Sequence, residues 1–143
     1  MKNKFYEIIK FPSFSGKTGT LTMLEHGKNP NSLVPFPIKR VFTIRGMKGE
    51  DERGGHTHHK TRQIIVCLRG SCRINLDDGK KKTFADLKDP SEGITLEPYI
   101  WHTISDFKGD PILMVLASTE YDERDYIRDY SQFLKLVSKT GNY

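Results

Sequence analysis

The stretch RGGHTHHKTRQ, residues 53–63, contains three of the five histidines of this 143-residue chain. Residues two positions apart on an extended strand project from the same face, so His56 and His58 would point together while Thr57 and His59 face the other side. Two adjacent imidazoles inside a small barrel are costly unless they are hydrogen-bonded, bound to a metal or facing a wet cavity. A single histidine is usually a surface residue or a satisfied core residue, but this pair beside glycines predicts a functional site.

The segments around this stretch are short, apolar and rich in β-branched residues, with turn signals between them. They are RVFTI (40–44), QIIVCLRGSCRINL (63–76), ITLEPYIWHTISDF (94–107) and PILMVLAST (111–119). Turns are predicted at Arg69-Gly70-Ser71, Asp77-Asp78-Gly79 and Asp89-Pro90. Several short strands at this spacing are typical of an all-β sandwich or barrel.

The end of the chain has a different pattern. From Asp122, the sequence DERDYIRDYSQFLKLV places apolar and aromatic residues at helical spacing, namely Tyr126, Tyr130, Phe133, Leu134 and Val137. Asp122 is a suitable N-cap. We therefore expect a short C-terminal helical segment against the barrel, with Tyr126 and Tyr130 packing this segment rather than contacting a ligand. No repeat or linker divides the sequence, which predicts a single domain over residues 1–143.

Composition limits the classes of partner. The net charge of +5 and the pI near 9.2 fit either an ordinary basic surface or an anionic ligand. The lysine run at 80–82 follows the turn signal DDG, which predicts a solvated hairpin tip, and no basic helix or basic–aromatic stripe indicates nucleic acid. Cys67 and Cys72 lack CxxC spacing and predict neither a zinc site nor a disulfide, and Cys67 is expected in the core. With no membrane-length apolar run and no signal-peptide core, we expect a cytoplasmic protein without a membrane partner.

Two sets of spaced residues resemble the two sequence motifs of the cupin superfamily. His56, His58, Gln63 and Gly70 outline the first motif, with Gln63 where metal-binding cupins carry a glutamate. The second motif is GITLEPYIWH (93–102), which ends on a histidine. The pairing of the motifs implies an all-β fold, a cupin-type jelly-roll barrel with a short C-terminal helical segment, whose mouth is lined by three histidines.

Three histidines at one mouth, His56, His58 and His102, could coordinate Zn, Fe, Mn or Ni. Gln63 is a neutral and weaker ligand than a carboxylate, and Arg53 adds positive charge close by, so both residues disfavour a divalent cation. We therefore expect neither a metal nor a cofactor. Without a metal, two facing imidazoles with an ordinary pKa of about 6.5 can pass a proton between them and a ligand near neutral pH. This arrangement suits chemistry that removes a proton beside a carbonyl group and returns it elsewhere.

The chain resembles the dTDP-sugar 3,4-ketoisomerases, which are cupin enzymes that act on dTDP-4-keto-6-deoxyglucose. The matching stretches are IKRVF (38–42), RGGHTHHKTRQIIVCLRGSCRINLDDG (53–79), GITLEPYIWHTISDF (93–107) and ILMVLASTEYDERDYIRDYSQF (112–133), while the first 37 residues match only loosely, through GTLTMLE (19–25). The resemblance implies a homodimer with exchanged N-terminal strands and a reaction without metal that exchanges a C4 ketone for a C3 ketone. The product would feed a transaminase that makes 3-amino-3,6-dideoxyhexoses.

The same resemblance implies roles for residues of the two motifs. His56 is expected to be the catalytic base and His58 its partner, although the sequence does not fix their order. Gln63 and His102 are candidates for hydrogen bonds to the developing enolate oxygen, and His102 could instead deliver the second proton. Arg53 could pair with the diphosphate, because a guanidinium matches phosphate oxygens in a fork, or be a surface loop charge.

Other positions depart from the family pattern or leave alternatives open. Trp101 could line the sugar or nucleotide pocket, or belong to the core. His59 stands where relatives usually carry a lysine, and Phe42 and Thr43 stand where they often carry tyrosines, so a tyrosine hydroxyl used there in relatives must be replaced by another group. The alternatives are a metal-dependent cupin enzyme and a non-catalytic cupin that binds a sugar nucleotide.

Overall fold

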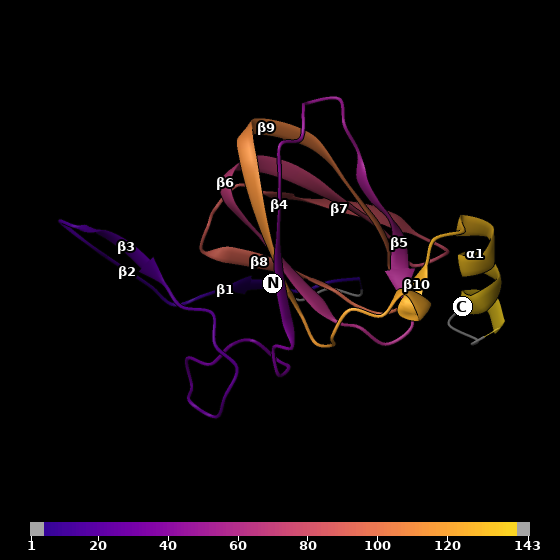
Figure 1. Cartoon of the computed structure of the whole chain (residues 1–143), viewed down its shortest axis with the longest axis horizontal. Coiled ribbons are helices and arrows are strands. Elements are labelled where there is room, and N and C mark those ends of the chain that lie inside the picture. The colour runs from indigo at the N-terminus through magenta and orange to yellow at the C-terminus, as the bar shows by residue number, and fades with distance from the viewer. Residues whose placement is uncertain (1–4, 140–143) are drawn as a thin grey trace.

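The structure is a computed structural model, and it describes residues 5–139. Eight strands form one antiparallel sheet that curls into a half-barrel, in the order β1-β8-β6-β9-β5-β10 with β4 on β9 and β7 on β6 (Figure 1). The strands are β1 (Ile8–Lys10), β4 (Arg40–Arg45), β5 (Arg53–His58), β6 (Gln63–Asp77), β7 (Lys82–Leu87), β8 (Glu92–Leu96), β9 (Trp101–Ala117) and β10 (Tyr126–Ile127). The fold is the expected all-β cupin-type jelly roll with one short C-terminal helix.

Two long strands, β6 and β9, hold the half-barrel together. The first half of β6 pairs with β8 and its second half with β7, while β9 pairs first with β5 and then with β4. The two long strands pair with each other, with register shifts between Cys67 and Arg73. The predicted turn at Arg69-Gly70-Ser71 is therefore wrong: it is an irregularity at which a continuous strand bends. The predicted segments 94–107 and 111–119 are likewise divided elsewhere, because the turn lies at 97–100 and β9 continues through 108–110.

The core follows the alternation of side chains along these strands. Ile65 and Cys67 of β6 face the interior of the half-barrel, where they join residues from β8 and β9. Ile64 and Val66 face outward and are covered by the N-terminal segment, through residues such as Phe11 and Phe36. Both faces of this part of β6 are buried, which explains its unbroken run of apolar residues.

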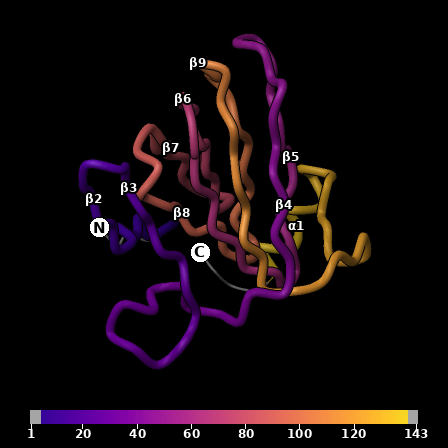
Figure 2. The backbone as a smooth tube through the Cα atoms, turned by 60° about the vertical axis from the view of Figure 1, so that its left-hand side comes forward, coloured from indigo at the N-terminus to yellow at the C-terminus, as the bar shows by residue number. Residues whose placement is uncertain are grey.

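An N-terminal hairpin, formed by β2 (Ser13–Gly16) and β3 (Gly19–Thr22), lies away from the main sheet (Figure 1). The backbone trace shows from a second direction that the hairpin lies at the side of the half-barrel where β7 and β8 are (Figure 2). Phe14 and Leu21 face each other across this hairpin and are 60% and 61% exposed.

The C-terminal arm is not the continuous helix that the spacing of its apolar residues predicts. Asp122 caps only the short 3-10 turn Glu123–Asp125, and Tyr126–Ile127 then pair with Thr57 and His58 of β5. The helix α1 (Tyr130–Lys139) begins later, where the Asp129 carboxylate accepts a hydrogen bond from the backbone of Gln132. The free edge of β5 satisfies the backbone of the arm and interrupts the helix. Within residues 5–139, no helix is long and apolar enough to cross a membrane.

Candidate active site

Three histidines meet inside the half-barrel. His56 and His58 project from β5, and His102 lies directly across from His56 on β9. The ring centroid of His56 is 5.2 Å from that of His58 and 4.7 Å from that of His102, and the His58 and His102 rings are 6.2 Å apart. The structure therefore brings together the three imidazoles that the two motifs predict.

A glycine pair sets this arrangement. Gly54 and Gly55 have φ values of +85° and +79°, and the register between β5 and β9 shifts between Gly54 and His56. A Cβ on Gly54 would lie 2.9 Å from the backbone oxygen of His102, so only glycine allows the two strands to approach this closely. The irregularity turns β5 so that His56 comes to lie against His102.

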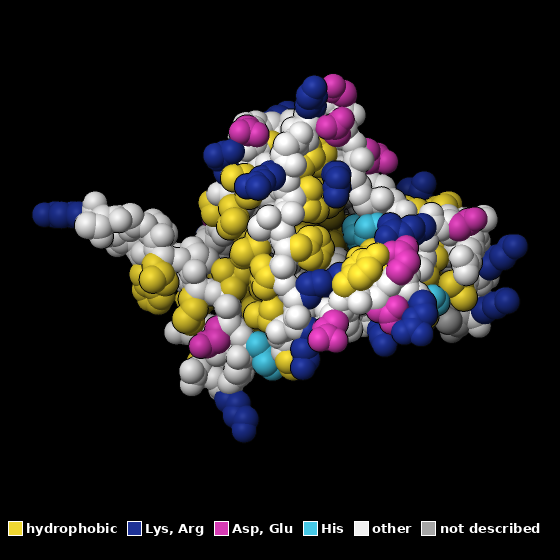
Figure 3. Space-filling view, viewed as in Figure 1, with side chains coloured by type: hydrophobic (Ala, Val, Ile, Leu, Met, Phe, Trp, Pro, Cys, Tyr) yellow, Lys and Arg dark blue, Asp and Glu magenta, His cyan; other side chains and the backbone are white. Residues whose placement is uncertain are grey.

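Two of the three histidines, His56 and His102, line a cavity of about 200 Å³, whereas His58 is 1% exposed and lies behind them, against His56 and Tyr126. Its walls are mostly apolar, and its polar lining consists of Arg53, His56, Gln63, His102, Tyr126 and Arg128. Of the residues expected to bind substrate, Arg53, Gln63 and His102 thus share one cavity with His56. Phe42 from β4 also lines it, at a position where the family pattern often has a tyrosine. In the space-filling view, histidine side chains are visible in a hollow bordered by basic and acidic side chains (Figure 3).

All three imidazoles are neutral in the free protein near pH 7. Burial lowers the pKa of His56 to about 4, with the positive charge of Arg128 as the next cause. Burial also lowers the pKa of His58 to about 4 and that of His102 to about 3, and each is lowered further by repulsion from neighbouring histidines. One buried nitrogen of each ring, Nδ1 of His56 and His102 and Nε2 of His58, has no hydrogen-bond partner within residues 5–139. A ligand in the cavity could pair with the nitrogens of His56 and His102.

The side chains that commonly bind metals form no ready metal site in the part of the chain that the structure describes. Among residues 5–139, no group of three or more histidine, cysteine, aspartate or glutamate side chains has an arrangement that could hold a metal ion. The two cysteines, Cys67 and Cys72, are buried and form no disulfide, and Cys67 lies in the core as the sequence predicts.

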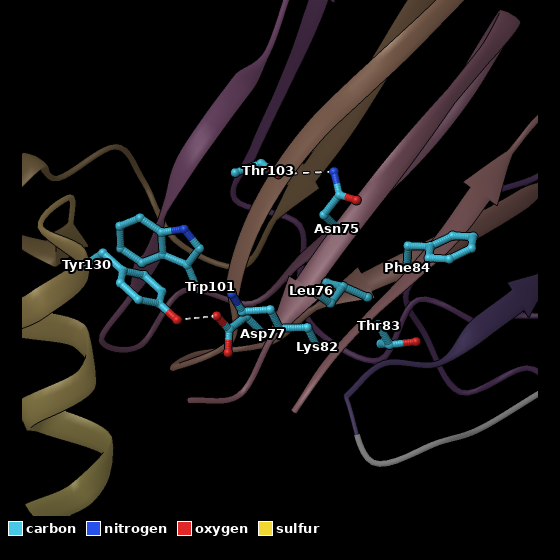
Figure 4. Close-up of a pocket in the computed structure, with 9 residues that line it drawn as sticks. All are labelled: Asn75, Leu76, Asp77, Lys82, Thr83, Phe84, Trp101, Thr103 and Tyr130. Carbon is cyan, nitrogen blue, oxygen red and sulfur yellow. Dashed lines mark hydrogen bonds between the residues drawn. The ribbon is translucent and has the colours of Figure 1, made fainter. Parts of the chain in front are cut away.

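Trp101 does not join the histidines. It precedes His102 on β9 and projects from the opposite face of the strand, where its ring contacts Tyr130 and Phe133 of the C-terminal helix. There it lines a second cavity, of about 390 Å³, together with Asp77 and Phe84 (Figure 4). The alternation of strand residues separates the two neighbours, so the structure does not bring Trp101 into the site that the two motifs outline.

The sequence analysis missed Tyr126 and Arg128, which line the histidine cavity. The Tyr126 ring lies edge-on to both His56 and His58, with centroids 5.1 and 4.5 Å away, and the Arg128 guanidinium lies 4.3 Å from the Tyr126 ring centroid. The expectation that Tyr126 packs a helical segment is therefore wrong. The two residues are separated by one position, which is the signature of a strand, but the longer helical spacing of the arm hid it.

Comparisons with known proteins agree with this fold and site. The family model described as FdtA: WxcM-like, C-terminal matches residues 4–138. A curated TDP-4-oxo-6-deoxy-alpha-D-glucose-3,4-oxoisomerase from Aneurinibacillus thermoaerophilus is 45% identical over 139 residues, which cover 97% of this chain and 95% of the relative. A crystal structure of a mutant of QdtA, a 3,4-ketoisomerase from Thermoanaerobacterium thermosaccharolyticum in complex with TDP-4-keto-6-deoxyglucose, matches with a TM-score of 0.89 at 35% identity, over 96% of this chain and 97% of that one.

A more distant neighbour carries information about the fold alone. The rmlC epimerase from Mycobacterium tuberculosis matches with a TM-score of 0.71 at 14% identity, over 88% of this chain and 69% of that one. The extent of the family match and the identity to the curated relative are decisive. The chain belongs to the WxcM-like, C-terminal family, among its sugar 3,4-ketoisomerases, and is an isomerase.

Proposed function

We propose that this chain converts dTDP-4-keto-6-deoxyglucose into a dTDP-3-keto-6-deoxyhexose through an enediol, with His56 and His58 moving the protons and no metal or cofactor taking part. The observation that carries the mechanism is the group of three neutral imidazoles in mutual contact, each with an unpaired ring nitrogen, two of which line one cavity. The choice of substrate rests on the name of the curated relative and on the sugar nucleotide bound to the solved neighbour. The product has a ketone at C3, where a transaminase could introduce an amino group.

The reaction moves two hydrogens. The hydrogen at C3 is acidic because C3 lies next to the C4 carbonyl group, and an imidazole removes it while the C4 oxygen takes up the negative charge. A proton is then added to C4, and the hydroxyl proton leaves O3 as the C3 carbonyl group forms. In sum, one hydrogen passes from C3 to C4 and another from O3 to O4, so no electrons are exchanged with an external partner.

The lowered pKa values suit both directions of proton transfer. At neutral pH the unprotonated imidazoles can accept the C3 proton, and an imidazolium whose pKa lies near 4 returns a proton readily. Gln63 and His102 line the same cavity, where a hydrogen bond to the developing C4 oxygen would stabilise the enediolate.

Arg53 is the candidate for the diphosphate. Its side chain lines the cavity and is exposed, so a guanidinium there can meet phosphate oxygens without being buried. Phosphates at this position would also place negative charge near the imidazoles.

The test is a proton NMR time course in D2O, with chelator-treated protein and dTDP-4-keto-6-deoxyglucose. Wild type is compared with His56→Asn and His58→Asn, and with His59→Asn as a matched control, because His59 is exposed and its ring contacts Tyr99 rather than the other histidines. We expect deuterium at C3 and a new 3-keto species with wild type and His59→Asn. Loss of general acid–base catalysis should slow both His56→Asn and His58→Asn by about 100-fold or more.

Three outcomes would contradict the proposal. An unchanged substrate spectrum with bound ligand would indicate a non-catalytic cupin that binds a sugar nucleotide. Activity that disappears with the chelator and returns with a metal would indicate a metal-dependent enzyme. If His56→Asn and His58→Asn were as active as His59→Asn, these two histidines would have no part in the mechanism.

A further inference from the structure

The reaction also requires the transfer of a hydroxyl proton, which the imidazoles that move the carbon-bound hydrogen do not account for. Isomerisation moves a proton from O3 to O4 in addition to the hydrogen that passes from C3 to C4. A single group can make this transfer between two neighbouring oxygens if it donates a proton to one and accepts a proton from the other. A neutral hydroxyl has both capacities at a single oxygen atom, whereas a neutral imidazole donates from one nitrogen and accepts at the other, and a guanidinium only donates.

One side chain in the cavity has this chemistry. Among the described residues that line it, Tyr126 is the only one with a hydroxyl group. Within residues 5–139 that hydroxyl makes no hydrogen bond, whereas the hydroxyls of Tyr121 and Tyr130 are bonded to Glu123 and Asp77. The Tyr126 ring lies against both His56 and His58, which places the phenol beside the groups that would move the carbon-bound hydrogen.

The position of Tyr126 is fixed from two sides. On one side, the Arg128 guanidinium lies over its ring and is itself held by the Glu123 carboxylate through two hydrogen bonds, of 2.9 Å from Nε and 3.1 Å from Nη2. A cation over a phenol face fixes the orientation of the ring. Glu123 also accepts a hydrogen bond from Tyr121. The carboxylate is therefore fully engaged in holding Arg128 over the ring.

On the other side, the buried Asp125 joins the arm to the histidine strand. Its carboxylate accepts hydrogen bonds from the backbone of Lys60 at 2.9 Å and of Thr61 at 3.1 Å, and from the Thr61 hydroxyl. Its backbone oxygen accepts a hydrogen bond from the backbone of His59 at 2.9 Å. Tyr126 follows directly and pairs with His58 in the sheet, so the phenol and the imidazole are held in one unit.

We propose that Tyr126 is a catalytic residue, whose hydroxyl donates its proton to O4 of the enediolate and accepts the proton of the O3 hydroxyl. The proposal rests on the proposed ketoisomerase function and adds a group to its mechanism. The O–H bond of the phenol breaks as the O4–H bond forms, and the O3–H bond breaks as the phenol is restored. The tyrosine is unchanged after the cycle and no external reactant is consumed.

If Tyr126 has this role, loss of its hydroxyl should affect hydrogen exchange at C3 and formation of the 3-keto product differently. Both reactions can be followed in one sample. Removal of the C3 hydrogen and its return from solvent puts deuterium at C3 without isomerisation, and this exchange needs the imidazoles but no transfer between oxygens. Formation of the 3-keto product needs both. A variant that lacks only the phenol hydroxyl should therefore retain exchange at C3 and lose product formation.

The experiment compares Tyr126→Phe with wild type by NMR in D2O at pH 7.5, following C3 deuteration of the substrate and appearance of the 3-keto species separately. We expect product formation to fall by about 100-fold and exchange by less than about tenfold, so that the ratio of exchange to isomerisation rises at least about tenfold. Tyr130→Phe is the matched control, because it removes a phenol hydroxyl from the same arm at the second cavity. It should keep the wild-type ratio.

A purely structural role of Tyr126 would slow exchange and product formation by the same factor, and that result, or two unchanged rates, would overturn the proposal. Failure of the ketoisomerase function itself would look different, because wild type would then show neither reaction. If Tyr126→Phe does not fold, 3-fluorotyrosine at position 126 keeps the shape of the side chain and makes the phenol more acidic. The rate of product formation should then begin to fall at a lower alkaline pH than in wild type, whereas the pH dependence of the exchange rate should be unchanged. An unchanged pH dependence of product formation would also overturn the proposal.

Discussion

The imidazoles of His56 and His58 can act as bases only when unprotonated, so their pKa values determine the acid limb of activity. Burial lowers both pKa values to about 4. We expect kcat/KM, which reports the free enzyme, to stay nearly level from pH 7.5 to about pH 5 and to reach half its plateau near pH 4. In the complex, the phosphates should favour the imidazolium, so the acid limb of kcat should lie at higher pH than that of kcat/KM.

Initial rates over pH 4 to 8 check this expectation, with each sample returned to pH 7.5 to confirm that the enzyme survived. A kcat/KM profile that falls by half near the ordinary histidine pKa of 6.5 would contradict it, since the site would then be more open to water than the structure indicates.

The same three histidines should make the folded chain sensitive to mild acid. Their folded pKa values, about 4 for His56 and His58 and about 3 for His102, lie below the ordinary value of 6.5, so the unfolded chain binds protons that the folded chain does not. The free energy of unfolding should therefore be highest above pH 6.5 and decrease as the pH falls below it. The carboxyl groups of Asp89 and Glu123, whose pKa values are lowered to about 2, lose their contribution only below about pH 4.5.

Urea unfolding at intervals between pH 7.5 and 4.5 tests this dependence. His58→Asn should give a shallower decrease than wild type over this range, because one proton-binding group of the unfolded chain is removed. An equal slope in wild type and His58→Asn would show that the buried imidazole does not account for the acid sensitivity.

At the residue scale, sequence motifs predicted the three histidines, Gln63 and Arg53, because a strand periodicity of two and a pair of short motifs are local signals. For Trp101 the sequence leaves two interpretations open, the ligand pocket and the core. Neighbours on a strand face opposite sides, however, and that same rule sends Trp101 to the second cavity. Tyr126 enters the site through pairing of its strand with residues almost 70 positions earlier, which no local pattern reports.

At the scale of elements, Gly70 lets the two long strands bend together. Its φ is +71°, and a Cβ there would lie 2.3 Å from the backbone oxygen of Lys108. Gly46 has a similar φ of +86°, but no atom lies within 4 Å of a Cβ placed there. A substitution at Gly46 therefore measures the free energy of the strained backbone conformation without a steric clash. We expect Gly46→Ala to lower the free energy of unfolding by about 1–2 kcal/mol. Gly70→Ala, which adds a backbone clash, should lower it by about 3–5 kcal/mol.

Urea titrations of the two variants measure the difference. Equal destabilisation would mean that β6 and β9 separate at low cost, and that the close approach of their backbones at Gly70 is not needed for the fold.

The bend at Gly70 could not be distinguished from a turn by the local sequence alone. The tripeptide Arg69-Gly70-Ser71 has turn composition, but the apolar run before it and the alternating residues after it pair with the same strand, β9. A glycine with positive φ serves a bend as well as a turn, and only the partner strand distinguishes the two. The C-terminal arm departs from the predicted helix for a related reason. Its residues Tyr126 and Ile127 pair with the open edge of β5, and this pairing overrides their helical spacing.

At the scale of the whole molecule, the N-terminal hairpin exposes two hydrophobic side chains, and we propose that a second copy of the chain covers them. An isolated two-stranded hairpin is marginally stable in water, and this one presents Phe14 and Leu21 to solvent. Hydrophobic side chains gather on the hairpin and on the face of the sheet beside it (Figure 3). We expect a homodimer, as the family resemblance implies, in which Phe14 and Leu21 contact the other subunit.

Sedimentation velocity or light scattering tests this association. The double variant Phe14→Ser with Leu21→Ser should weaken the dimer by at least about 100-fold. Phe84→Ser, which alters an exposed aromatic residue on β7, should leave it unchanged. A monomeric wild type would contradict the homodimer, and an unaffected double variant would contradict the role of the hairpin.

Exchange of the N-terminal strands can be separated from simple association. In the structure, Lys10 of β1 lies directly opposite Glu92 of β8, and an exchanged dimer would keep this register with β1 supplied by the other copy. Cysteines in place of both residues should oxidise across the pair. Exchange, which the resemblance implies, would join two chains, and a non-reducing gel would show a covalent dimer, whereas strands that stay with their own chain would give a cross-linked monomer. The buried Cys67 and Cys72 should take no part, so wild type treated with the same oxidant serves as the control.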